Sequence, residues 1–392
     1  MTSKLIAPEL ARKIRDEFQT RQEIIEALIK TLVELESPSG DFNGSRAVVD
    51  VLVNAVNDLR CVSKVERVDV PGFGQNLVIE AFSEQQVTGQ ILLVGHTDTV
   101  HEFGSLLRQP FRREDKKLFG PGTFDMKANC VLAIEALRCI EKLNVTPQFG
   151  VTIVLTCDEE VGSQSGWPVI ERVARSRNTR CAFVMEPPAP GGRVKTGRKG
   201  TGMFSIKVEG KAAHAGLEPE KGASAILELA RQTERLHAIN DAGSGITLNV
   251  GVVSGGTRSN VVAAEAQGEI DVRFATEDES KQLEQLFKSI EPIDERVKVF
   301  VSGGINRPPL ERTPAVVELF ETARSVGAMI GFELGEAQVG GASDGNFIAA
   351  MGIPVLDGLG ISGDGAHAKH EHILADDISI RGTLITGLLL SC

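Results

Sequence analysis

Residues 91–98, ILLVGHTD, join an apolar strand to an abrupt polar end. The run from Ile91 to Val94 has β-branched residues at both ends, which is typical of a central strand in a parallel sheet. Ligand-binding and catalytic groups collect at the carboxyl ends of such strands. His96 and Asp98 are two residues apart, so in extended backbone both side chains leave on the same side. One imidazole can then hold a metal while a nearby carboxylate orients it.

The composition is that of an ordinary folded protein. The chain has 392 residues, which suits two domains better than one. Hydrophobic residues make up 42% and charged residues 24%. The formal net charge of -11, with no block of Lys or Arg, argues against a nucleic-acid partner. No stretch approaches the roughly 20 apolar residues that span a bilayer, so we expect no membrane association.

The cysteines and the N-terminal sequence indicate a cytoplasmic location. The six cysteines are scattered and form no CxxC pattern, which favours free thiols in a reducing compartment and argues against a thiolate zinc site. The opening sequence, MTSKLIAPELARKIRDEFQ, is charged and has a helical period. It lacks the apolar core and cleavage site of a signal peptide.

Alternating helices and strands up to residue 194 predict an α/β domain with a mostly parallel sheet. The predicted strands are 61–70, 76–82, 91–95, 150–156 and 181–185. The predicted helices cover 8–36, about 45–59, the segment from Asp125 to about 143, and a segment ending near 176. The loop between residues 96 and 122 is expected to be polar and irregular.

The pattern changes near residue 194 to the βαββαβ order of a ferredoxin-like α+β unit. Its predicted elements are strand 201–209, helix 222–238, strands 246–254 and 261–274, helix 277–290 and strand 295–302. The α/β pattern then resumes with helix 313–327, a short strand near 333, a helix near 344–351, strand 353–356 and helix 375–390. We therefore predict a catalytic domain made of residues 1–196 and 306–392, interrupted by an inserted domain at 197–305.

Carboxylates follow several of the predicted strand ends. Asp125 opens a helix after the glycine-rich GPGTFD, Glu159 and Glu160 follow strand 150–156, and Glu186 follows the next strand. Carboxylates in such places repel one another and are costly to bury unless a cation compensates them. Imidazole and carboxylate groups without a cysteine pattern fit Zn²⁺ or a similar divalent ion.

Two metals about 3.5–4 Å apart need a bridging carboxylate, and Asp125 is the natural candidate. Glu159 and Glu160 are neighbours, so in extended chain their side chains point in opposite directions. One can bind metal while the other faces the water as a general base. The alternative for this pair is a solvated strand end.

The C-terminal loop GDGAHAKHEH offers three candidate histidine ligands, His367, His370 and His372, and their spacing does not choose between them. His101 and His237 fit plain surface positions better, His237 being on a predicted amphipathic helix.

A series of short motifs resembles the di-zinc metallopeptidases that include acetylornithine deacetylase, succinyl-diaminopimelate desuccinylase, aminoacylase and carboxypeptidase G (glutamate carboxypeptidase). The motifs span roughly residues 90–372 in the order and spacing of that family. They are GHTDTV, GPGTFDMK, DEEVGS, VMEP, GKAAHAG, SNVV with DVRF, GGASDGN and GAHAKHE. The segments DEEVGSQSG and GRKGTGMFSIKVEGKAAHAG look most similar to the glutamate carboxypeptidase branch.

The resemblance implies a ligand set for two zinc ions per subunit, with Co²⁺ or Mn²⁺ as possible substitutes. His96 and Glu186 would hold one ion, and Glu160 and His367 the other. Asp125 would bridge them. The histidine of the family's GAH motif is matched by His367, which selects it among the three candidates.

The resemblance also implies roles around the metals and in the inserted domain. Asp98 would orient the first histidine ligand, and Glu159 would be the general base. The inserted domain would act as a lid and dimerisation domain. In a homodimer, His214 would reach the partner's active site and steady the oxyanion. Asn260 and Arg273 would hold the substrate's free carboxylate, the arginine by a forked pair of hydrogen bonds.

The residues of the inserted domain also have plain structural interpretations. Arg273 could pair with Asp271 or Glu269 on the sheet, Asn260 could shape a turn, and His214 could be an ordinary loop histidine.

Two departures from the family pattern occur in the catalytic domain. The usual Met-Lys-Gly-Gly after the bridging aspartate is replaced by Met126, Lys127, Ala128 and Asn129, and Cys157 precedes the acidic pair, where it could fill the core or reach the site.

The predicted function is that of a di-zinc exopeptidase or amidase. It would cleave an amide or peptide bond next to an amino acid with a free carboxylate, as a glutamate carboxypeptidase does, on a small peptide or N-acyl amino acid. The alternative is an N-acyl-amino-acid deacylase, and a non-catalytic protein that keeps the fold is a third possibility. A nucleotide-dependent enzyme using GLGISG is disfavoured, because no helix is predicted after that motif.

Overall fold

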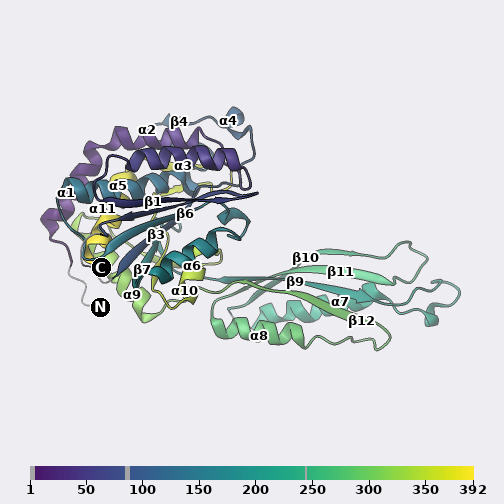
Figure 1. Cartoon of the computed structure of the whole chain (residues 1–392). Coiled ribbons are helices and arrows are strands. Elements are labelled where there is room, and N and C mark those ends of the chain that lie inside the picture. Colours follow the sequence, from purple (N-terminus) through teal and green to yellow (C-terminus); the bar gives the residue numbers. More distant parts are fainter. Residues whose placement is uncertain (1–4, 84–88, 243–244) are drawn as a thin grey trace. The chain divides into compact units, whose positions relative to one another are not determined.

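The computed structural model describes residues 5–83, 89–242 and 245–392 and divides into two compact units (Figure 1). Unit 1 comprises Met1–Thr196, Arg312–Gln338 and Ser343–Cys392. Unit 2 comprises Gly197–Glu311 and Val339–Ala342, so it interrupts the first unit in sequence. Each unit has its own cluster of buried hydrophobic residues.

Unit 1 is built on a six-stranded sheet with the order β1-β2-β6-β3-β7-β14. Its strands are β1 (Val62–Val70), β2 (Gly74–Ala81), β3 (Gln90–His96), β6 (Gly150–Thr156), β7 (Thr179–Val184) and β14 (Val355–Leu356). Strands β6, β3, β7 and β14 run parallel, while β1 and β2 are antiparallel to their neighbours. All seven residues of β3 are buried between β6 and β7. The predicted mostly parallel sheet, with the 91–95 strand at its centre, is confirmed.

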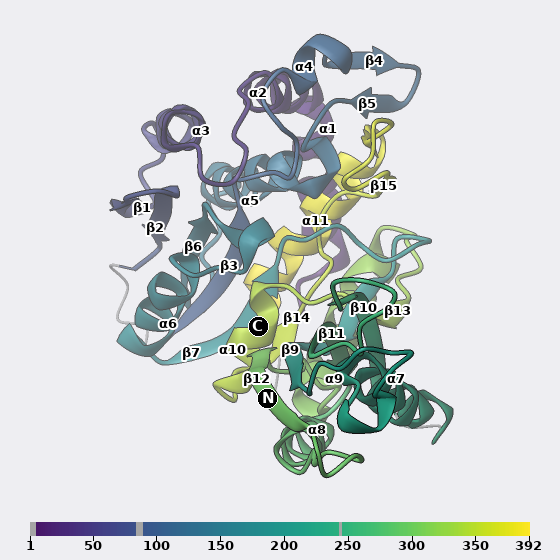
Figure 2. The same cartoon turned by 90° about the vertical axis from the view of Figure 1, so that its right-hand side faces the viewer.

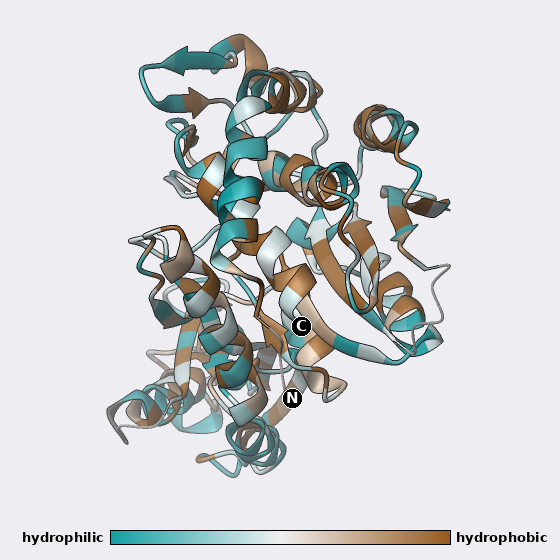
Figure 3. Cartoon of the chain, turned by 90° about the vertical axis from the view of Figure 1, so that its left-hand side faces the viewer, coloured by the Kyte–Doolittle hydropathy of each residue, from teal (hydrophilic) through white to brown (hydrophobic). Residues whose placement is uncertain are grey.

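Helices pack around this sheet. They are α1 (Pro8–Thr20), α2 (Gln22–Val33), α3 (Phe42–Val56), α4 (Ser105–Arg108), α5 (Ala128–Lys142), α6 (Gly166–Ser176), α9 (Pro314–Met329), α10 (Asp344–Ala350) and α11 (Asp377–Ser391). Nearly every residue of α11 is buried, and it packs against α1, α5 and α9, so its apolar residues surround the helix. The visible strands of the sheet are mainly brown in Figure 3, whereas several helices alternate brown and teal along their length. Among the described residues, no helix has both the length and the apolar character needed to cross a bilayer.

The single helix predicted over 8–36 is wrong, because α1 and α2 are separated at Arg21. The backbone of Arg21 has φ -94° and ψ 1°, outside the helical region. Its guanidinium forms an ion pair of 2.7 Å with the buried Glu135 of α5. A buried carboxylate needs such a partner, and the turn brings the arginine to it.

A small four-stranded sheet occupies segments that were predicted as loops. Its order is β15-β16-β5-β4, with β4 (Arg112–Glu114), β5 (Lys117–Phe119), β15 (Gly363–Asp364) and β16 (His372–Leu374). Figure 2 shows the β4–β5 hairpin near β15. Because β16 pairs with β5, the histidine-rich loop is held against the segment that precedes Asp125.

A separate two-stranded sheet joins β8 (Val194–Arg198) to β13 (Glu336–Val339). The strand β13 begins a few residues beyond the strand predicted near 333.

Unit 2 has the predicted βαββαβ order. Its elements are β9 (Gly200–Glu209), α7 (Ala225–His237), β10 (Thr247–Gly255), β11 (Glu265–Phe274), α8 (Glu277–Lys288) and β12 (Lys298–Arg307). The strands pair antiparallel in the order β10-β11-β9-β12, and Figure 1 shows α7 and α8 along one face of the sheet. Phe204, Ile206 and Val208 of β9 are buried, while Met203 and Lys207, which alternate with the buried positions of this strand, are exposed. This alternation is that of a sheet covered on one face.

Candidate metal centre

Five predicted ligands come together at the carboxyl ends of the parallel strands in unit 1. His96 is the last residue of β3, and Glu186 lies two residues beyond β7. Asp125 lies in the turn Thr123–Lys127 before α5, Glu160 in a short 3-10 helix (Glu159–Val161) after β6, and His367 in the loop between β15 and β16. Parallel strands present their carboxyl ends at one edge of the sheet, which explains how residues so far apart in sequence meet.

The first group of ligands is His96, Asp125 and Glu186. His96 Nε2 lies 3.1 Å from Asp125 Oδ1 and 3.5 Å from Glu186 Oε1. Burial alone would lower the pKa of His96, but hydrogen bonds to Asp125 and the neighbouring carboxylates outweigh burial and raise that pKa well above its usual value. The imidazole therefore sits in a strongly electronegative environment.

The second group is Asp125, Glu160 and His367. His367 Nε2 lies 3.2 Å from Glu160 Oε2 and 3.4 Å from Asp125 Oδ2. The hydrogen bond to Asp125 raises the pKa of His367 to about 9. Burial raises the pKa of Glu160 to about 7. The His367 side chain is 54% exposed, against 1% for His96, so this group faces solvent more openly than the first.

Asp125 belongs to both groups, and its two oxygens face different histidines. Oδ1 is directed to His96 and Oδ2 to His367. Burial would raise the pKa of Asp125, but the two imidazoles lower it. Tetrahedral ligands about 2.1 Å from a zinc ion lie about 3.4 Å from one another, which matches the spacing of these donors. Glu160 Oε1 is buried and has no hydrogen-bond partner in the described structure, so the donor set fits a pair of divalent cations.

Asp98 touches both the first histidine and the acidic pair. His96 Nδ1 lies 3.0 Å from the Asp98 backbone carbonyl and 3.3 Å from its carboxylate. The Asp98 carboxylate accepts hydrogen bonds of 3.2 Å from the backbone N–H groups of Glu159 and Glu160, and one of 2.6 Å from the Ser39 hydroxyl. Asp98 therefore links the end of β3 to the turn after β6.

The extended conformation predicted for Glu159 and Glu160 is wrong, because both residues lie in a 3-10 helix. Their directions are set by this helical turn, which Asp98 holds through the two backbone N–H groups. The Glu159 side chain is partly buried. Alternation along a strand therefore does not set the directions of the two carboxylates.

The surface position predicted for His101 is wrong. Its side chain is only 11% exposed, and its Nε2 lies 2.6 Å from a carboxylate oxygen of the buried Glu371. Sequence reasoning did not single out Glu371, although it stands in the GAHAKHE motif. His237 is partly buried in unit 2, where its Nε2 accepts a hydrogen bond of 3.3 Å from the Val250 backbone N–H.

The two departures from the family pattern are packed into the core. Asn129 is fully buried, and its amide donates to the Phe124 carbonyl (3.3 Å) and accepts from the Ile361 N–H (2.9 Å). The Cys157 thiol is also buried, 3.9 Å from the Ser165 hydroxyl, and burial raises its pKa to about 12. Cys157 therefore fits the interpretation as a buried filler.

The predicted substrate-binding residues lie in unit 2. His214 is exposed, forms an isolated β-bridge with Val261, and accepts a hydrogen bond of 3.2 Å from the Gly216 N–H. The backbone carbonyl of Asn260 accepts from the Ala215 N–H (3.0 Å), so the two loops are joined.

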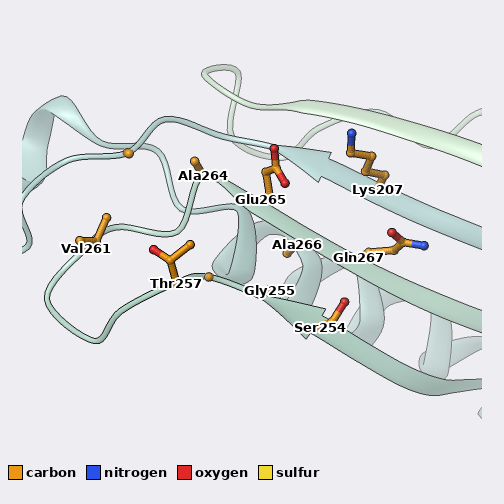
Figure 4. A pocket seen from close by; sticks show the side chains of 11 residues that line it. Lys207, Ser254, Gly255, Thr257, Val261, Ala264, Glu265, Ala266 and Gln267 are labelled. Atoms are coloured by element: carbon orange, nitrogen blue, oxygen red, sulfur yellow. The ribbon is translucent and has the colours of Figure 1, made fainter.

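Arg273 makes the structural contact that the sequence allowed. It donates through Nε and Nη2 to the two carboxylate oxygens of Asp271, at 2.9 and 3.0 Å. Near these loops, a cavity of about 470 Å³ lies at the ends of β9, β10 and β11 (Figure 4). Lys207, Glu265 and Val261 are among its lining residues, and none of the predicted site residues is.

Two adjoining groups of imidazole and carboxylate donors, at the strand ends of a mostly parallel sheet, fit the active site of a metal-dependent enzyme. The chain belongs to the peptidase family M20/M25/M40, whose model matches residues 92–391. The chain is thus an enzyme of the peptidase and amidohydrolase class, and the family resemblance of its motifs is confirmed.

Similar proteins agree with this assignment. Carboxypeptidase G2 of Pseudomonas sp. (strain RS-16) is 30% identical over 372 residues, covering 91% of this chain and 87% of the relative. Succinyl-diaminopimelate desuccinylase of Delftia acidovorans is 28% identical over 305 residues, covering 74% and 78%. The crystal structure of aminopeptidase PepT from Bacillus cereus shares the fold, with a TM-score of 0.79 at 24% identity, covering 94% of this chain and 98% of that one.

Proposed function

We propose that the protein is a di-zinc exopeptidase of the glutamate carboxypeptidase type, which cleaves an amide or peptide bond next to an amino acid with a free carboxylate. The observation that carries the proposal is Asp125, whose two oxygens face the histidines of two separate ligand groups. The similarity to carboxypeptidase G2 over 91% of the chain supports the substrate class.

His96, Asp125 and Glu186 would hold one zinc, and Asp125, Glu160 and His367 the other. When bound, the two ions supply Lewis acidity at the scissile carbonyl. The remaining chemistry is proton transfer by the chain itself.

Glu159 is the general base in this proposal. It takes a proton from the attacking water and delivers it to the leaving nitrogen. Asp98 contacts both the backbone of the Glu159–Glu160 turn and the His96 ring. It therefore fixes the position of the base relative to the metal ligands.

Unit 2 would supply the substrate contacts, and the protein would work as a homodimer. Arg273 and Asn260 bind the substrate carboxylate, and His214 stabilises the oxyanion in the partner's active site. The exposure of His214 and the hydrogen bond between its loop and that of Asn260 support this role.

We also propose a cytoplasmic location. All six cysteines are free thiols, which supports it.

An N-acyl-amino-acid deacylase is the second candidate, favoured by the similarity to succinyl-diaminopimelate desuccinylase. Both reactions hydrolyse an amide beside a carboxylate-bearing residue. Assays of the zinc-loaded protein on C-terminal-glutamate peptides, folate, dipeptides and N-acyl amino acids separate the two candidates.

The decisive variant is Glu159→Ala. We expect kcat to fall by at least about 10²-fold, because the proton acceptor is lost, while metal analysis still finds two zinc ions per chain. Glu171→Ala, which removes a partly exposed glutamate of α6, is the control and keeps full activity. Normal turnover in Glu159→Ala contradicts the assignment of the base, and a wild-type chain that binds no zinc contradicts the proposed function as a whole.

A further inference from the structure

Glu371 is a buried carboxylate beside the candidate metal centre that serves as acceptor for several donors. Its side chain is 0% exposed. It accepts hydrogen bonds from the backbone N–H groups of Gly122 (2.9 Å), Phe124 (2.8 Å) and Asp125 (2.9 Å), and His101 Nε2 lies 2.6 Å away. A carboxylate, which only accepts hydrogen bonds, suits all of these N–H groups at once.

The donors come from different parts of the chain. His101 follows β3, the strand that ends at His96, and the three backbone donors lie in the turn that carries Asp125. Glu371 itself lies four residues after His367, and its backbone carbonyl accepts from the Gly120 N–H (3.2 Å). One carboxylate therefore joins the segments that carry His96, Asp125 and His367.

The junction needs a side chain that accepts hydrogen bonds at both of its oxygens. Oε2 faces Gly122 N–H and His101 Nε2, and Oε1 faces the N–H groups of Phe124 and Asp125. An amide in place of the Glu371 carboxylate would present N–H hydrogens to at least one of the N–H groups that now donate to it. The turn holding Asp125 would then lose part of its support, although none of the metal ligands would be removed.

We propose that Glu371, held by His101, is the positioning residue that sets the spacing between the two metal subsites. It fixes Asp125, the ligand shared by both groups, relative to His367. The inference rests on the proposed function, because it concerns the binding of two ions. The group around His367 depends on Glu371 most, because His96 and Glu186 are placed by β3 and β7.

Glu36 offers a matched control. It is a partly buried carboxylate that also accepts two backbone hydrogen bonds, from Gly104 and Leu106 at 2.9 Å each. These donors lie at the start of α4, and among the described residues Glu36 accepts no hydrogen bond from the turn that carries Asp125. Glu36 lies close enough to Lys127 to interact with its charge, but a Glu36→Gln variant repeats the chemical change without removing any hydrogen bond to Glu371.

The test is a zinc titration of the full chain by calorimetry, with circular dichroism to confirm folding. In Glu371→Gln we expect one of the two ions, the one that we assign to the group around His367, to lose about 10- to 100-fold in affinity. The ion at the other group should lose less. Glu36→Gln should keep both wild-type affinities. His101→Ala should show a smaller loss, and His101→Gln, which keeps an N–H donor, should recover part of it.

The positioning role is overturned if folded Glu371→Gln binds both ions with wild-type affinity. It is also overturned if both ions lose affinity by the same factor. A loss in Glu36→Gln as large as that in Glu371→Gln overturns it as well. If Glu371→Gln does not fold, the two His101 variants decide, and wild-type affinities in His101→Ala overturn the proposal. A wild-type chain that binds fewer than two ions refutes the proposed function itself, which this series separates from a failure of the positioning role.

Discussion

Two histidines and three carboxylates share a small volume in the candidate metal centre, so protons and cations compete for the same atoms. The hydrogen bond to Asp125 raises the pKa of His367 to about 9, and burial raises the pKa of Glu160 to about 7. Near neutral pH, without a cation, His367 therefore carries a proton on its imidazole. A metal ion must displace that proton before it can bind the ring nitrogen.

Zinc affinity should accordingly rise with pH. Below pH 9 the imidazolium of His367 is the majority form, so the ion that binds it releases about one proton from the ring. Below about pH 7 the same ion also displaces a proton from Glu160, so apparent affinity rises at least about tenfold per pH unit and more steeply toward pH 6. Calorimetry between pH 6 and 8, in buffers with different ionisation enthalpies, measures both the affinity and the protons released. An affinity that does not change over this range contradicts the predicted competition.

The ligand residues were accessible to sequence reasoning to different degrees. His96 and the acidic groups stand at strand ends, where the pattern itself indicates a site. The choice of His367 over His372 needed the family motif, because the spacing of the histidines does not distinguish between them. In the structure His372 is buried with its ring 4.9 Å from that of Phe119, whereas His367 reaches Glu160.

At the scale of helices and strands, long elements were predictable and short ones were not. Strand 150–156 was placed at its observed bounds, because six consecutive apolar or β-branched residues after Gly150 leave little choice. The strands β4, β5, β15 and β16 have two or three residues each, too few to show a period. The 3-10 turn of Glu159 and Glu160 is equally short, and its conformation depends on Asp98 from another strand end.

The start of α5 depends on Asn129, which ties this helix to the loop after β14. A Cβ at Gly360 would lie 2.3 Å from Asn129 Nδ2, so the amide fits against a glycine. We expect Asn129→Ala to lower the free energy of unfolding by about 1–3 kcal/mol, because the buried Ile361 N–H loses its acceptor.

Urea denaturation of the purified protein measures this change. Asn57→Ala, which alters an exposed asparagine after α3, serves as control and should stay within about 0.5 kcal/mol of wild type. A stability of Asn129→Ala equal to that of the control would show that the loop finds another acceptor.

At the scale of the whole molecule, β10 offers a strand edge for assembly. β10 is one of the two outer strands of the sheet in unit 2, β12 being the other, and Val252 and Val253 on β10 are 60% and 61% exposed. Unpaired strand edges with apolar residues favour pairing with another chain. A second copy of the chain that pairs along β10 would cover them, in agreement with the proposed homodimer.

Replacing Val252 and Val253 together by lysine should therefore yield a monomer, because charged residues on a strand edge oppose pairing. Analytical ultracentrifugation measures the mass, and kcat should fall with dimer dissociation if His214 serves the partner's site. Met203→Lys alters a 70% exposed residue on the inner strand β9, so it should leave the dimer intact. A wild-type monomer, or a double variant that remains dimeric, contradicts the predicted interface.

The insertion of unit 2 into unit 1 also dictates an order of events during protein synthesis. Unit 2 is continuous from Gly197 to Glu311, so most of its core has left the ribosome before α11 is made. Unit 1 must wait for α11, which is buried against α1, α5 and α9. A nascent chain that ends within unit 2 already holds the first ligand group but lacks His367, so the second metal subsite is completed only when translation has passed the insertion.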